Sequence, residues 1–122
     1  MPSQKIPLKT AKNNPNFNHV FDVEPQEVFE LKGQVKLVDV RRPDELTGEL
    51  SHIEGVTHIV LDELGSRLSE IPKDETVIFV CRSGQRSASA TDFAQSQGYK
   101  EVYNMLGGMI KWNELKLPIA RN

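Results

Sequence analysis

The sequence contains one cysteine, Cys81, among its 122 residues. A single cysteine excludes an internal disulfide, a Cys-x-x-Cys redox pair and a zinc site rich in thiolates. Long apolar runs are also missing, because the longest one, residues 77–81, falls far short of the roughly 20 residues of a membrane span. The first ten residues, MPSQKIPLKT, lack the apolar segment of a secretory signal. These absences favour a cytoplasmic protein with no membrane partner and one free thiol.

A strong charge of either sign is absent as well. The 15 basic and 17 acidic side chains give a net charge of -2, which is too near neutral for a protein that binds duplex DNA by neutralising phosphates. We therefore expect no nucleic-acid partner. Residues 1–16 hold three lysines, three prolines and no acidic residue, which is typical of a solvated arm. The sequence thus predicts a flexible arm over residues 1–16 and a single domain over residues 17–122.

Short runs rich in β-branched residues recur from residue 17 onward, and each predicts a strand. The run Val77–Val80 is apolar throughout, which is typical of a parallel strand covered on both faces by helices. The other runs are Leu37–Val40, Val56–Val60, the weaker Val102–Asn104, and Val20–Phe21, which predicts the start of an edge strand.

Amphipathic stretches between these runs predict helices. One begins near Pro25, and a second has Asp62 as its N-cap. A third spans Arg86–Gln97 and stops at Gly98, and the last spans about Gly108–Leu115. Alternating strands and helices imply an α/β fold, with a mainly parallel sheet of about five strands flanked by helices on both faces.

Cys81 directly follows the most apolar predicted strand, and the loop after it leads into a helix. Ligand sites in α/β sheets lie outside the carboxyl ends of strands, and a loop entering a helix offers unpaired N–H groups to an anion. Gly84 allows a tight turn, while Arg82 and Arg86 add two positive charges. Each feature favours thiolate over thiol, so Cys81 is the candidate nucleophile rather than an inert core residue.

The spacing between Cys81 and Arg86 distinguishes two kinds of anion chemistry. Cysteine phosphatases that resemble the tyrosine phosphatases place five residues between their cysteine and arginine, which makes a long cradle for phosphate. Only four residues separate Cys81 from Arg86, and the position that a phosphatase needs for arginine is Ser87. The tighter loop suits a smaller group, such as the outer sulfur of a persulfide, and so favours sulfur transfer.

The chain resembles the single-domain rhodanese-like sulfurtransferases in three motifs that occur in the same order. Residues 81–87, CRSGQRS, resemble the active-site loop of that family, which begins with the catalytic cysteine. Residues 37–45, LVDVRRPDE, resemble its Asp-x-Arg segment, and SHIEGV at 51–56 replaces its Gly-His-Ile-Pro-Gly-Ala turn. Residues 104–108, NMLGG, followed by Trp112 and Pro118, are similar to its closing signature.

The resemblance spans about residues 18–120 and implies a rhodanese-like three-layer fold. It also implies a two-step transfer through a Cys81 persulfide, with no metal and no organic cofactor. The donor would be a small thiosulfate-like anion, and the acceptor an external thiol or a sulfur-carrier protein, because one cysteine cannot resolve its own persulfide. By the same resemblance, Asp39 and Arg41 would support the loop from beneath, and the persulfide would be bound by Arg82, Ser83, Gly84, Gln85, Arg86 and Ser87.

The sequence departs from the family at one functional point. The two-domain liver-type enzymes have a second basic group near the cysteine, whereas this chain has Glu45 close to that place. We hypothesise that Arg82 and Arg86 supply the missing positive charge.

Two alternatives stay open at this point. A cysteine-based phosphatase or arsenate reductase would use the same thiolate, although such enzymes on this fold have a loop one residue longer. A non-catalytic module for binding or sulfide sensing would share the fold, although inactive modules often lose the cysteine. The three histidines, His19, His52 and His58, have no metal-ligand spacing, and we expect Trp112 to pack in the core. The sequence sets no expectation for the oligomeric state.

Overall fold

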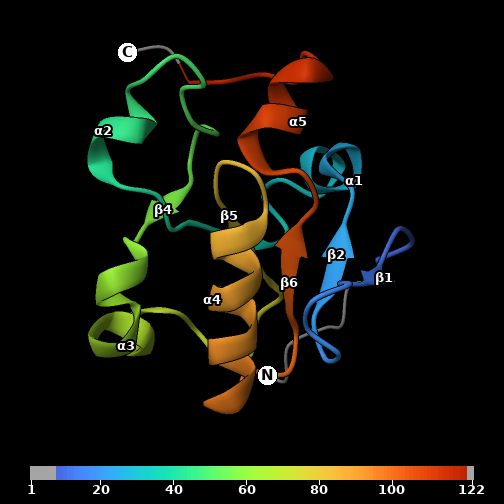
Figure 1. The fold of residues 1–122 in the computed structure, drawn as a ribbon, viewed down its shortest axis with the longest axis vertical. Coiled ribbons are helices and arrows are strands. Elements are labelled where there is room, and N and C mark those ends of the chain that lie inside the picture. The colour runs from blue at the N-terminus through green and yellow to red at the C-terminus, as the bar shows by residue number, and fades with distance from the viewer. Residues whose placement is uncertain (1–7, 121–122) are drawn as a thin grey trace.

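The computed structural model describes residues 8–120 and has a six-stranded sheet at its centre (Figure 1). The strands are β1 (Lys12–Asn13), β2 (Phe21–Val23), β3 (Lys36–Asp39), β4 (Thr57–His58), β5 (Val77–Val80) and β6 (Val102–Met105). The helices are α1 (Pro25–Glu30), α2 (Pro43–Leu46), α3 (Leu64–Arg67), α4 (Gln85–Ser96) and α5 (Gly108–Glu114). Two 3₁₀ helices, η1 (Leu61–Glu63) and η2 (Leu68–Glu70), flank α3.

The strand order is β1-β2-β6-β5-β3-β4. All neighbouring pairs are parallel except β1 with β2, which is antiparallel. This arrangement confirms the expected α/β class with a mainly parallel sheet. None of the helices within residues 8–120 is long and apolar enough to cross a membrane.

Two apolar cores lie on opposite faces of the sheet, because successive side chains of a strand point to opposite sides. Val77 and Phe79 of β5 belong to the core that includes residues of α3 and α4. Ile78 and Val80 belong to the core that includes residues of α1 and α5. All four side chains are fully buried, which explains the continuous apolar run in the sequence. The sheet is thus the middle layer of three, with α4 in front of β5 and β6 in Figure 1.

Three expectations about local elements are corrected by the structure. The strand beginning at Phe21 is not an edge strand, because β2 pairs with β6 on one side and with β1 on the other. The sixth strand, β1, was not expected because two exposed polar residues carry no strand signal. Asp62 is not an N-cap but lies inside η1, since the buried Leu64 and Leu68 pack through three short helical segments instead of one helix.

Residues 8–16, the described part of the expected arm, lie against the domain. The carboxylate of Glu27 accepts hydrogen bonds from the backbone N–H groups of Lys9 at 2.7 Å and Thr10 at 2.9 Å. Burial of Glu27 acts to raise its pKa, but the hydrogen bonds from Thr10 and Lys9 outweigh burial and lower it. Residues 1–7 lie outside the described residues, and the flexibility of the arm stays a prediction.

Candidate active site

Cys81 lies directly after β5, at the carboxyl end of the strand that the sequence marked as most buried. Its side chain is fully buried, and its Sγ accepts a hydrogen bond from the backbone N–H of Gly84 at 3.0 Å. Gly84 has a φ of 102°, a left-handed conformation that favours glycine, and it is the N-cap of α4. The turn at Gly84 therefore directs a backbone donor back toward the sulfur.

The first turn of α5 holds this loop in place. Its N–H groups have no partners within the helix, and two of them donate to the loop: Met109 to the carbonyl of Cys81 at 2.8 Å and Ile110 to that of Arg82 at 3.0 Å. Gly108 permits this approach, because a Cβ at that position would lie 2.5 Å from the Cys81 carbonyl oxygen. The glycine pair in the closing motif thus lets α5 fix the backbone of the loop.

The two loop arginines have different surroundings. Arg86 contacts Glu45 of α2 at two points, Nη1 to Oε1 at 2.7 Å and Nη2 to Oε2 at 2.8 Å. The hydrogen bond with Arg86 lowers the pKa of Glu45 to about 2, and the same bond raises the pKa of Arg86. Arg82 is exposed, and its side chain forms no ion pair or hydrogen bond with any described residue. Of the two arginines, therefore, only Arg82 has a positive charge that no acidic side chain within residues 8–120 pairs with.

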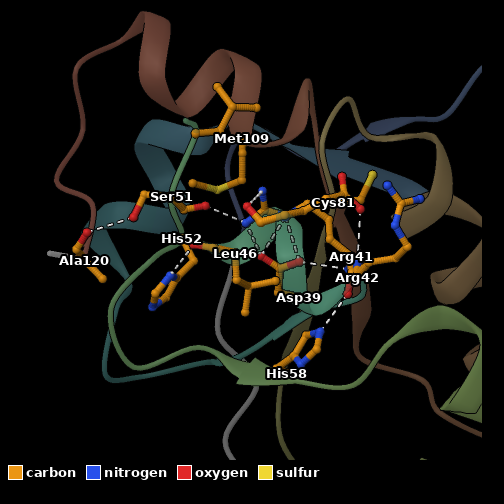
Figure 2. Close-up of polar contacts among 12 residues, drawn as sticks. Asp39, Arg41, Arg42, Leu46, Ser51, His52, His58, Cys81, Met109 and Ala120 are labelled. Carbon is orange, nitrogen blue, oxygen red and sulfur yellow. Dashed lines mark hydrogen bonds and ion pairs between the residues drawn. The ribbon is translucent and has the colours of Figure 1, made fainter. Parts of the chain in front are cut away.

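Asp39, the last residue of β3, forms a buried ion pair with Arg41, two positions later (Figure 2). Arg41 Nη2 lies 2.9 Å from Asp39 Oδ2, and Nε lies 3.0 Å from Oδ1. Arg41 also donates to the carbonyls of Glu45 at 3.2 Å and Ser51 at 2.7 Å, which ties α2 to the segment that follows it. Most of the guanidinium donors of Arg41 are thus already bonded, and the expected role of the pair in supporting the Cys81 loop stays a prediction.

Two histidines near this ion pair, His52 and His58, form hydrogen bonds with backbone carbonyl groups. His58 Nε2 lies 2.6 Å from the carbonyl oxygen of Arg41, and His52 Nδ1 lies 2.9 Å from that of Leu46 (Figure 2). No group of three His, Cys, Asp or Glu side chains within residues 8–120 is placed to hold a metal ion. Trp112 is fully buried in the core, as expected.

Two pockets border the Cys81 loop, on opposite sides of it, because β5 lies between β3 and β6. The pocket on the β6 side has a volume of about 450 Å³ and includes Ser83, Gly84 and Gln85 in its wall. The pocket on the β3 side has a volume of about 220 Å³. It is lined by Arg41, Asp44, Glu45, Gly48, Glu49, Leu50 and Arg82. Acidic side chains thus outnumber basic ones in the smaller pocket.

The sequence reasoning about function missed two residues, Asn104 and Asp22, that are linked to the Cys81 sulfur through Ser87. Asn104 forms a hydrogen bond with Ser87, whose Oγ lies 3.2 Å from Cys81 Sγ, and Asn104 Nδ2 donates to Asp22 Oδ1 at 2.9 Å. Asp22 and Asn104 are opposite each other in the β2–β6 pairing. The sequence could have indicated these two residues, because each is a polar residue in an otherwise apolar strand. Buried polar groups need hydrogen-bond partners, so two such residues are expected to contact each other or another polar group.

Comparisons with known proteins agree with this geometry. A family model described as the rhodanese-like domain matches residues 8–115. A protein of Allochromatium vinosum named sulfurtransferase is 41% identical over 86 residues, which cover 70% of this chain and 78% of that protein. The thiosulfate sulfurtransferase GlpE of Vibrio cholerae is 29% identical over 104 residues, which cover 85% of this chain and 95% of GlpE.

A solved structure gives the same result. The human single-domain sulfurtransferase TSTD1 superposes with a TM-score of 0.67 and 30% sequence identity. The match covers 76% of this chain and 95% of the human one. Because the family model, the sequence relatives and the fold all agree over most of its length, the chain belongs to the rhodanese-like domain family.

Proposed function

We propose that the chain is a sulfurtransferase that moves sulfane sulfur from thiosulfate, or from another persulfide or polysulfide donor, to a thiophilic acceptor. The observation that carries the proposal is the placement of Cys81, whose sulfur lies at the carboxyl end of β5 and accepts the Gly84 N–H at 3.0 Å. The short loop, in which only four residues separate Cys81 from Arg86, favours a sulfur atom over a phosphate group. The relatives named sulfurtransferases support the same activity.

In the first step, the Cys81 thiolate attacks the outer sulfur of thiosulfate. A new S–S bond forms at Cys81, the S–S bond of thiosulfate breaks, and sulfite leaves with the electron pair. Arg82 attracts the anionic donor, because its side chain has no ionic partner among the described residues. The N–H of Gly84 points toward the cysteine sulfur before any donor arrives, so it needs no reorganisation during the reaction.

In the second step, an external nucleophile attacks the outer sulfur of the Cys81 persulfide. Cyanide would leave as thiocyanate, and a thiol would leave as its own persulfide, while the Cys81 thiolate is regenerated. We assign the loop residues to the binding of this persulfide: Arg82, Ser83, Gly84, Gln85, Arg86 and Ser87. The acceptor must be a second molecule, either a small thiol or a sulfur-carrier protein, because Cys81 is the only cysteine in the sequence.

Intact-protein mass spectrometry before and after incubation with thiosulfate tests this proposal. We expect the protein to gain one sulfur atom, and we expect cyanide to remove that atom as thiocyanate in equal amount. Cys81→Ser is the control, and it should gain nothing under the same conditions. If folded wild-type protein gains no sulfur from either thiosulfate or polysulfide, the proposed function is wrong.

A further inference from the structure

A buried chain of hydrogen-bonding side chains lies behind the sulfur of Cys81. It runs from Asp22 of β2 through Asn104 of β6 to Ser87 of α4. Their exposed fractions are 5% for Asp22, 1% for Asn104 and 0% for Ser87. Three polar side chains at this depth are stable only because each is the partner of the next.

Asp22 fixes the orientation of the Asn104 amide. An ionised carboxylate can only accept hydrogen bonds, so the amide nitrogen of Asn104 faces it, at 2.9 Å. Asn14 adds a second donor to the same carboxylate, with Nδ2 at 3.0 Å from Oδ1 and 3.3 Å from Oδ2. The amide oxygen of Asn104 is thereby turned toward Ser87. Asn104 consequently offers Ser87 an acceptor and no donor.

The hydroxyl of Ser87 has two neighbours but only one proton. Its Oγ lies 3.2 Å from Cys81 Sγ and is also hydrogen-bonded to Asn104 Oδ1. When the proton is donated to Asn104, only lone pairs of Oγ face the sulfur, and this arrangement suits a protonated thiol. When the proton is donated to the sulfur, it stabilises an anionic thiolate, and Asn104 loses its donor.

We propose that Asp22 and Asn104 are positioning residues that act through Ser87 on the charge state of Cys81. Asn104 competes with the sulfur for the single proton of Ser87, and Asp22 keeps Asn104 in the competing orientation. The pair therefore restrains thiolate formation at Cys81 in the resting protein. The relevance of this restraint to sulfur transfer rests on the proposed function, whereas the competition itself concerns only the thiol.

The other charged groups around Cys81 do not act through this chain. They belong to the loop, to α2 and to the end of β3, and they are Arg82, Arg86, Glu45, Asp39 and Arg41. Among the described contacts, none of their side chains is hydrogen-bonded to Ser87, Asn104 or Asp22. A double-mutant cycle can therefore separate the effect of Asp22, Asn104 and Ser87 on the thiol from the effect of these charges.

The ultraviolet absorbance of the thiolate, measured over a pH series, tests the proposal without requiring a sulfur donor. For each variant, the absorbance of the same protein carrying Cys81→Ser is subtracted. Ser87→Ala removes the donor, so the midpoint of thiolate formation should rise by about 0.5 to 1 pH unit, a three- to tenfold loss of thiolate. Asn104→Leu keeps the branched shape and removes the competing oxygen, so the midpoint should fall by a similar amount.

The decisive comparison is Asn104→Leu in the Ser87→Ala background, where we expect no further shift of the midpoint. The proposal is overturned if Asn104→Leu fails to lower the midpoint, or if it shifts the midpoint equally in both backgrounds. If Asn104→Leu does not fold, Asp22→Asn takes its place, because an amide at position 22 allows Asn104 to turn its nitrogen toward Ser87. The loss of charge in Asp22→Asn acts in both backgrounds, so only the difference between the two shifts counts.

The outcomes also separate this inference from the proposed function. A coupled shift in a protein that gains no sulfur from thiosulfate or polysulfide would refute sulfur transfer and leave the positioning role standing. A protein that forms the persulfide but shows no coupling between Asn104 and Ser87 would refute the positioning role alone.

Discussion

Arg86 and Glu45 join α4 to α2 through two contacts of 2.7 and 2.8 Å beside the Cys81 loop. A pair at this distance neutralises much of the charge that Arg86 would offer to an anion. Glu45 also lines the smaller pocket together with Asp44 and Glu49. The β3 side of the site is therefore less attractive to a dianion than the loop sequence alone suggests.

Glu45→Gln is expected to improve the use of thiosulfate. The neutral amide leaves the charge of Arg86 uncompensated, so the KM for thiosulfate should fall by about three- to tenfold while kcat changes less. Steady-state kinetics with thiosulfate and cyanide measure both constants. Asp44→Asn is the matched control, because Asp44 lines the same pocket but pairs with the exposed Arg42. Equal falls in KM for both variants would show that Arg86 is not the reason.

The same ion pair makes stability depend on pH. The hydrogen bond with Arg86 lowers the pKa of Glu45 from 4.5 to about 2 in the folded protein. A carboxylate with a lowered pKa stabilises the fold above its unfolded pKa, and this contribution is lost as the pH falls through the folded value. Because the side chain of Arg86 is 33% exposed, the contribution at neutral pH should be on the order of 1 kcal/mol.

Urea unfolding of wild type and Glu45→Gln over a pH series measures this contribution. The wild-type protein should be more stable at neutral pH, and the difference should shrink as the pH falls from about 4.5 toward 2. A difference that stays constant over this range would contradict the assignment to the Glu45 carboxylate.

Gly108→Ala is expected to destabilise the protein by about 3 kcal/mol or more. The added Cβ would clash with the carbonyl groups of Cys81 and Arg82, and the φ of 58° adds strain. Gly33→Ala is the control, since its φ of 89° is also left-handed but a Cβ there meets nothing within 4 Å. That variant should lose only about 1 kcal/mol, and urea unfolding measures both. Equal losses would mean that the contact with the loop contributes nothing.

Glu27→Gln is expected to loosen residues 8–16 from the domain. One carboxylate oxygen of Glu27 accepts a hydrogen bond from Lys9 and the other accepts hydrogen bonds from Thr10. The amide of glutamine has one oxygen instead of two, so it cannot accept from both residues in this way. Trypsin cleavage after Lys9 and Lys12 should become about five times faster, because the released segment is open to proteolysis more of the time. Glu30→Gln, an exposed carboxylate on the same helix, should leave the cleavage rate unchanged. Protection that survives Glu27→Gln would argue against this anchor.

The reactive loop could be predicted because one continuous stretch of sequence contains its determinants. The apolar strand Val77–Val80, the thiol of Cys81, the turn at Gly84 and the following helix are all consecutive. Local sequence therefore placed the thiol of Cys81 at the end of a buried strand, and the structure confirms that position.

The partners of the loop could not be predicted in the same way. Glu45 lies 41 positions from Arg86, and Asp22 lies 82 positions from Asn104. These pairs meet only because of the strand order and the path of α2, which no short stretch of sequence contains. The expected N-cap at Asp62 failed for a related reason, because burial of the nearby leucines overrides local capping preference.

Complete burial of Cys81 also determines which oxidation products its thiol can form. Two protein molecules cannot bring their cysteines within bonding distance while each sulfur has 0% exposure. Disulfide-linked dimers are therefore excluded unless the loop opens. Small oxidants that reach the sulfur would form a sulfenic acid, and no second cysteine in the chain can condense with it. Burial of the Cys81 thiol thus limits its oxidation to small molecules and prevents disulfide cross-links between protein molecules.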